Sequence, residues 1–205
     1  MGLLMISSTG AFAQASFGVK AGLNFSNMPQ KFGGEKVDDI KLKPGFNIGA
    51  FADLKLSDLL AVEAGLQVET KGYRMKEESF GVTYKQSLNL IYVTIPVDAR
   101  FNFGDFYVLA GPYLGIAASG KLKNTIEYDG DKEKETETLE FGNDEKDSDL
   151  KRLDIGLGFG AGYEFTDNLG ARLGYDLGLA NLVPGGDKDN KITNGSINLS
   201  VTYRF

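Results

Sequence analysis

The side chains that could carry chemistry in this chain are carboxylates, because the sequence contains neither His nor Cys. Their absence removes the most common general base, the thiol nucleophile and the thiolate metal ligands. Two carboxylate pairs could still act as acid and base: Asp154 with Glu164, and Glu63 with Glu69. Because arginines occupy the same polar faces, we expect ion pairs there rather than a catalytic dyad. We therefore predict that the protein is not an enzyme.

Two further motifs imitate ligand-binding sites. The alternate glycines of residues 156–162 have the spacing of a dinucleotide-binding loop, but no helix follows them, so the match fails. Residues 187–190, Asp-Lys-Asp-Asn, place oxygen ligands at calcium-like spacing without the full loop and its terminal Glu. We read this segment as a turn. The sequence therefore predicts no cofactor and no metal.

The composition bounds the class of protein. The 205 residues are 42% hydrophobic and 24% charged, which suits one folded domain. The net charge of −6 makes nucleic acid a poor candidate partner. Apolar runs fall short of the ~18 residues that a membrane helix needs, but alternating strands could still cross a membrane as a barrel.

A period of two dominates the sequence, and no segment keeps the period of a helix. In residues 153–165, for example, apolar residues alternate with Gly, Asp and Glu. The strand at 106–118 is apolar on both faces, so its register stays open. Pro96 and Pro112 lie inside strands, where each weakens the pairing or marks a bulge. The eight predicted strands are 17–26, 45–56, 60–71, 88–101, 106–118, 153–165, 169–180 and 196–205.

The connections between these strands alternate in length. Short ones at 57–59, 102–105 and 166–168 alternate with long ones at 27–43, 75–86, 119–150 and 181–191. An even number of strands with short turns at one end is typical of an outer-membrane barrel. Within the acidic segment 119–150 we expect the fifth and sixth strands to continue as a ribbon, with a hairpin tip at 129–131.

Alternation does not say which face points inward. A soluble lipocalin-like barrel would put the apolar face inside, whereas a membrane barrel puts it against lipid. Many glycines on the polar face favour a narrow lumen, in which they make room for long side chains. The predicted luminal polar network comprises Glu63, Glu69, Asp98, Arg100, Asp154, Glu164, Arg172, Asp176 and Arg204.

The first residues have the character of a targeting segment. Residues 1–13 carry no charge and end in Ala-Phe-Ala, the pattern of the back half of a secretory signal peptide. An apolar first strand is the alternative. We expect a partial signal peptide at 1–13, export, and a barrel domain at 14–205.

Several segments resemble outer-membrane β-barrel proteins of Bacteroidetes, often labelled PorT-like or porin-family. They are residues 17–26, Ile95-Pro96, 110–115, 160–165 and the closing 202–205. The resemblance implies an eight-stranded antiparallel up-and-down transmembrane barrel, similar to OmpX or the OmpA membrane domain. It also implies that Tyr203 and Phe205 form the signal that the barrel assembly machinery reads.

The expected function is that of a non-catalytic integral outer-membrane protein, structural or contacting partners through its extracellular loops. Alternatives are an accessory role in a secretion system, a narrow porin-like transporter, and a soluble ligand-binding barrel. Side chains fill the interior of eight strands, so we do not expect an open channel. The expected partners are outer-membrane lipid, the assembly machinery and an envelope or extracellular protein, with the chain itself a monomer.

Overall fold

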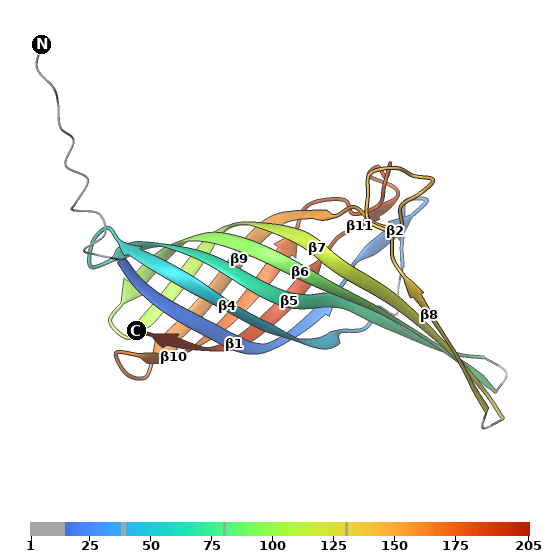
Figure 1. Ribbon diagram of the computed structural model, residues 1–205, viewed down its shortest axis with the longest axis horizontal. Helices are drawn as coiled ribbons and strands as arrows, with labels where there is room; N and C mark the ends of the chain where they lie inside the picture. Colours follow the sequence, from blue (N-terminus) through green and yellow to red (C-terminus); the bar gives the residue numbers. More distant parts are fainter. Residues whose placement is uncertain (1–14, 38–39, 80, 130) are drawn as a thin grey trace, which may run out of the picture.

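Long antiparallel strands close into a tilted barrel (Figure 1). The computed structural model describes residues 15–37, 40–79, 81–129 and 131–205. Within this part of the chain eight strands form the ring: β1 Ala15–Asn27, β4 Lys43–Lys55, β5 Leu60–Ser79, β6 Val82–Phe103, β7 Phe106–Tyr128, β9 Leu153–Glu164, β10 Leu169–Gly178 and β12 Gly195–Arg204. The ring closes where β1 pairs with β12, from Gly18 opposite Arg204 to Asn27 opposite Gly195. The predicted fold class is confirmed.

The barrel presents its apolar face outward. On β1 Leu23 is 57% exposed, whereas the next residue, Asn24, is fully buried. A strand side chain points to alternate faces, so this difference follows directly from the period of two. The exposed apolar face belongs against lipid, and the polar face lines the interior.

Strand β7 resolves the register that the sequence left open. Tyr107, Leu109 and Tyr113 are buried in the interior, and Phe106 and Leu114 point outward. The two strand prolines cause no register shift. Pro96 pairs with Tyr113, and the irregularity of the β6–β7 pair falls instead between Ile91 and Tyr92.

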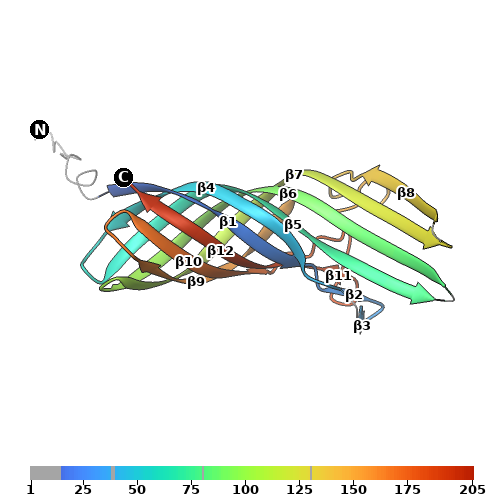
Figure 2. The ribbon, with the colours of Figure 1, turned by 90° about the horizontal axis from the view of Figure 1, so that it is seen from below.

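Strands β5, β6 and β7 continue beyond the barrel at the end with the long connections, and β8 joins them there (Figure 2). Strands β5 and β6 stay paired as far as Ser79 opposite Val82, so the prediction of a long loop at 75–86 was wrong. Beside them β7 runs to Tyr128 and pairs with β8, Asp131–Thr138. We call residues 72–79, 82–90, 119–128 and β8 the extracellular blade.

The predicted ribbon in 119–150 is correct for its first arm, and the pairing of β7 with β8 extends to Tyr128 opposite Asp131. Residue 130, in the predicted hairpin tip, lies outside the described residues. The second arm does not run on into the sixth barrel strand, because β8 ends at Thr138 and β9 begins at Leu153. Between them the chain leaves the blade and crosses the barrel mouth, where Phe141 bridges to Leu150.

A small sheet lies at the same end as the blade (Figure 2). It joins the first and fourth long connections through β2 Gln30–Phe32, β3 Glu35–Lys36 and β11 Lys191–Ile192, in the order β11-β2-β3. The short turns and the C-terminus lie at the opposite end (Figure 1). In an outer-membrane barrel the short turns are periplasmic and the long connections extracellular.

The predicted signal peptide at 1–13 lies outside the described residues and stays a prediction. Among the residues that the structure describes, no helix is long and apolar enough to cross a membrane.

Candidate functional site

The barrel interior begins, at its periplasmic end, with a layer of arginine–carboxylate pairs. Arg172 holds Glu63 through two parallel hydrogen bonds, Nη1 to Oε1 at 2.6 Å and Nη2 to Oε2 at 2.7 Å. Its Nε donates to the hydroxyl of Tyr107 at 3.1 Å. Both charged side chains are buried, so each needs the other to offset its lost hydration. Two-pronged pairing of this kind also fixes orientation.

Two more arginines complete this layer. Arg100 donates from Nη2 to Glu164 Oε1 at 2.9 Å, and its guanidinium lies 3.6 Å from the ring centroid of Tyr107. Arg204 donates from Nε to Asp53 Oδ2 at 3.0 Å and also pairs with Glu164. Three arginines thus meet three carboxylates, and the layer carries no net formal charge. We call this set the arginine layer: Asp53, Glu63, Arg100, Glu164, Arg172 and Arg204.

A lysine layer lies further toward the extracellular end. Lys71 is completely buried, with its Nζ 3.3 Å from Glu69 Oε1 and 3.2 Å from Asp154 Oδ2. The same ammonium lies 4.5 Å from the centroid of the Tyr113 ring, whose hydroxyl donates to Asp154 at 3.2 Å. Thr94 donates to Glu69 at 2.6 Å. A single cation therefore bridges two carboxylates, each of which also accepts a hydrogen bond from a neighbouring hydroxyl.

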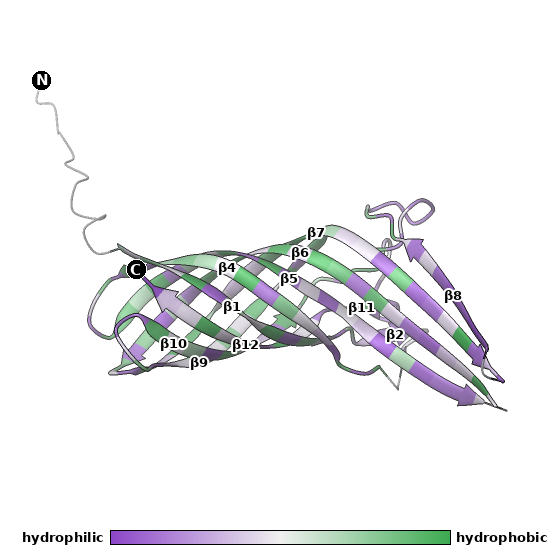
Figure 3. Cartoon of the chain, turned by 60° about the horizontal axis from the view of Figure 1, so that its bottom comes forward, coloured by the Kyte–Doolittle hydropathy of each residue, from purple (hydrophilic) through white to green (hydrophobic). Residues whose placement is uncertain are grey.

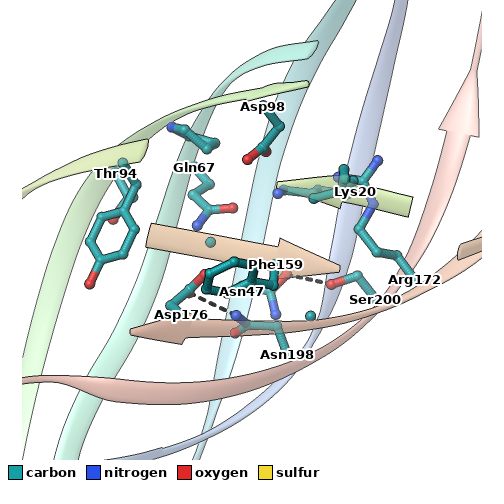
Figure 4. Close-up of a pocket in the computed structure, with 15 residues that line it drawn as sticks. Lys20, Asn47, Gln67, Thr94, Asp98, Phe159, Arg172, Asp176, Asn198 and Ser200 are labelled. Atoms are coloured by element: carbon teal, nitrogen blue, oxygen red, sulfur yellow. Dashed lines mark hydrogen bonds between the residues drawn. The ribbon is translucent and has the colours of Figure 1, made fainter. Parts of the chain in front are cut away.

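Between the two layers lies a cavity of about 50 Å³, into which Lys20, Asp98 and Asp176 project (Figure 4). Asn198 donates to Asp176 at 2.8 Å and is drawn beside it in the same view. This space suits a few water molecules, since one water needs on the order of 10–15 Å³.

The extracellular mouth is closed by an apolar cluster. Tyr73, Leu88, Leu90, Tyr92 and Ala117 come from β5, β6 and β7, and all are buried. The long connections add Met28, Leu150 and Leu182, which pack on the strand residues. The interior is therefore filled from the arginine layer to this apolar cluster, apart from the small central cavity.

Residues 12–183 match the family model described as "Outer membrane protein beta-barrel domain". The chain belongs to this family. The protein is accordingly an outer-membrane barrel, as the exposed apolar belt and the sorting of short and long connections predict.

Solved structures add to the family match. Neisserial surface protein A has a TM-score of 0.52 and 13% identity, over 93% of this chain and 99% of that one. Ail, the attachment invasion locus protein of Yersinia pestis, has a TM-score of 0.46 and 18% identity, over 94% of this chain and 99% of its own. The first likeness supports the fold alone. A search of curated proteins gives no significant match.

The barrel separates the carboxylates that could have formed a catalytic pair. Glu63 lies in the arginine layer against Arg172, and Glu69 lies in the lysine layer against Lys71. Asp154 and Glu164 likewise fall into different layers. Each of these four carboxylates is within ion-pair distance of a cation, the arrangement of a structural network.

Sequence reasoning missed the centre of the lysine layer and the luminal tyrosines. Lys71 stands on the same strand face as Glu69, and this spacing could have revealed it. Tyr107 and Tyr113 gave no such signal, because their strand is apolar on both faces. Glycines of β9 make room for them: a Cβ on Gly156 would lie 2.6 Å from the Tyr113 ring. The glycine spacing at 156–162 thus serves luminal packing.

The terminal aromatic residues and the acidic turn lie outside the lumen. The rings of Tyr203 and Phe205 point outward at the periplasmic rim, with centroids 5.7 Å apart, and Phe205 is 76% exposed. In the turn, Asp187 Oδ1 accepts the backbone N–H groups of Asp189 and Asn190 at 2.9 and 2.8 Å. The bond from Asn190, followed by that from Asp189, lowers the pKa of Asp187.

Proposed function

We propose that this outer-membrane barrel is neither a channel nor an enzyme, and that it presents its extracellular blade to a partner outside the membrane. The filled interior carries the proposal. A solute would have to displace the arginine layer, the lysine layer and the apolar cluster in turn. Breaking a buried ion pair costs on the order of 3–5 kcal/mol, so passage without rearrangement is disfavoured.

The blade supports the second half of the proposal. All eight residues of β8 are exposed. Polar contacts hold its strands together: Lys85 donates to Glu127 at 2.8 Å, and Gln86 donates to Asn124 at 3.1 Å. Hydrogen bonds from Lys85 and Lys132 lower the pKa of Glu127, so this carboxylate is charged at neutral pH. A solvated, hydrogen-bonded sheet of this kind suits contact with another macromolecule.

Membrane lipid and the barrel assembly machinery are the other partners that we propose, with the chain itself a monomer. A narrower form of the same proposal is that the chain belongs to the PorT-like group of Bacteroidetes and is an accessory factor in secretion. Such a role also requires a protein partner.

Conductance in planar bilayers tests the closed interior. We expect no current steps from the purified protein, and no steps from a conservative Lys55→Gln control at the rim. Stable steps from the unaltered protein would refute a closed barrel.

Site-directed crosslinking in intact cells tests the blade. A photoreactive residue at Lys134 on β8 should give a protein adduct, and one at the lipid-facing Leu173 should not. Adducts from neither position, or equal adducts from both, would refute a specific contact through the blade.

A further inference from the structure

The small extracellular sheet carries a row of lysines. In its register Lys191 stands directly opposite Lys31, and Lys31 stands directly opposite Lys36. Residues that face each other in an antiparallel sheet point to the same side, with Cβ atoms about 4.5–5.5 Å apart. Three ammonium groups therefore line one face of three adjacent strands.

Among the residues that the structure describes, this row has no ion-pair partner. Within the described residues none of the three lysines takes part in an ion pair or a side-chain hydrogen bond. Glu35 pairs with Phe32, one position further along, and so points to the opposite face. Like charges directly opposite each other destabilise a sheet. The chain as a whole has a net charge of −6, yet positive charge is concentrated in this row. The repulsion among these lysines destabilises the sheet locally, and a bound anion would relieve it.

The lysine row borders a depression of about 500 Å³ between the first and fourth long connections. Lys188 adds a fourth cation to its wall, and Gln30 and Thr193 add neutral hydrogen-bonding groups. The volume is within the range of small-molecule sites, about 300–1,000 Å³. Pro29 and Val37 supply the apolar part of the lining.

We propose that this depression, which we call the lysine site, binds a saccharide that carries several phosphate or sulfate esters. Lysine binds such esters as a point charge, and a row of lysines suits more than one ester. The amide and hydroxyl groups of the wall suit sugar hydroxyls. No aromatic side chain is among the described residues that line it, so it lacks the stacking platform of single-stranded nucleic acid sites. The lysine site is independent of the proposed contact through the blade, because the two share only their extracellular position.

The first test is titration of the full-length protein in detergent micelles with a fully sulfated disaccharide. We expect saturable binding that weakens as salt is added. The double variant Lys31→Gln/Lys191→Gln should lose at least tenfold in affinity, and Lys31→Arg/Lys191→Arg should keep it. A matched control, Lys123→Gln/Lys134→Gln, makes the same change of charge on the blade and should bind normally.

The double glutamine variant also has a stability readout. Removing like charges that face each other should leave the unfolding midpoint of the free protein unchanged or raised. The unaltered protein should gain thermal stability from the disaccharide, and the variant should not. Absence of binding, an equal loss in the blade control, or equal affinity for a single-stranded oligonucleotide would overturn the proposal.

A second arm identifies the source of the ligand. The disaccharide is titrated against protein in nanodiscs that contain either lipopolysaccharide or phosphatidylcholine alone. If the disaccharide binds more weakly in the lipopolysaccharide discs, and the glutamine variant binds lipopolysaccharide less than the unaltered protein does, the site is assigned to phosphorylated glycolipid of the membrane. Equal binding in both assigns it to a soluble saccharide.

Discussion

Strands β5 and β6 differ in hydropathy pattern between the barrel and the blade, and each strand changes along its own length (Figure 3). Inside the barrel, the inward side chains of β6 are polar, as at Arg100, Asp98 and Thr94. Beyond Thr94 the inward positions belong to the apolar cluster, at Tyr92, Leu90 and Leu88. The outward positions change in the other sense, from the exposed apolar residues of the barrel to the polar strands of the blade.

The difference shows that the surrounding medium decides which side chains point inward at each end. Lipid surrounds the barrel and gives apolar side chains no reason to turn inward, so the interior can hold ion pairs. Water surrounds the extracellular end, where the hydrophobic effect drives apolar side chains into a core. The same two strands therefore fold as a membrane protein at one end and as a soluble protein at the other.

The largest expected effect comes from the arginine layer. Arg172→Leu leaves Glu63 buried without its two-pronged partner, and we expect a loss of about 3–5 kcal/mol in the free energy of unfolding. Denaturant titration in detergent measures it. The double variant Glu63→Leu/Arg172→Leu removes both charges and should recover most of the loss. An unchanged unfolding midpoint in the single variant would show that this ion pair contributes little to stability. The explanation that the barrel interior depends on ion pairs would then be wrong.

The apolar cluster provides the matching test at the other end. Leu90→Ala opens a cavity in a fully buried site, so it should cost about 2–5 kcal/mol. The control Leu66→Ala removes the same atoms from a side chain that is 56% exposed toward lipid, and it should cost less in detergent. Equal losses would mean that the extracellular end has no core of its own. Protease sensitivity of the blade should rise in Leu90→Ala only.

Deleting Phe205 should have a small effect on stability and a large one on assembly. Its ring is exposed at the rim, and its backbone N–H donates to Phe17 O at 3.0 Å, so little packing is lost. If the assembly machinery reads this terminus, cells should contain much less heat-modifiable barrel, while refolding in detergent stays near normal. Phe205→Tyr keeps an aromatic terminus and serves as the control. Equal losses in both assays would assign Phe205 to packing alone.

The smallest effect is expected at the periplasmic turn. Lys55 Nζ lies 2.8 Å from Asp58 Oδ1, but both side chains are well exposed, so Asp58→Asn should leave the unfolding midpoint unchanged. The hydrogen bond from Lys55 lowers the pKa of Asp58. Any stabilisation is therefore present at neutral pH and is lost only as the pH falls below the ordinary pKa of 3.8. A measurable loss at neutral pH would show that exposed pairs matter here.

Much of the fold could be predicted because it depends on local alternation. The eight strands, the tight turns, the outward apolar face and the pairing of β7 with β8 all follow from a period of two bounded by turn residues. The extension through 75–86 escaped prediction, since residues 75–79 and 82–86 are exposed or half-buried on both faces and no alternation remains there. Apolar loop residues such as Leu150 and Leu182 likewise gave no pattern to read.

The sequence alone determined that each strand has one apolar and one polar face, because adjacent side chains point in opposite directions whatever the strand packs against. Only the tertiary structure decided which charges meet. Arg172 and Glu63 are 109 residues apart, and their contact depends on the order, tilt and register of strands around a closed ring. The same closure brought the lysines of the first and fourth long connections into one row. Partners across a lumen or between distant loops are set by geometry that no local pattern encodes.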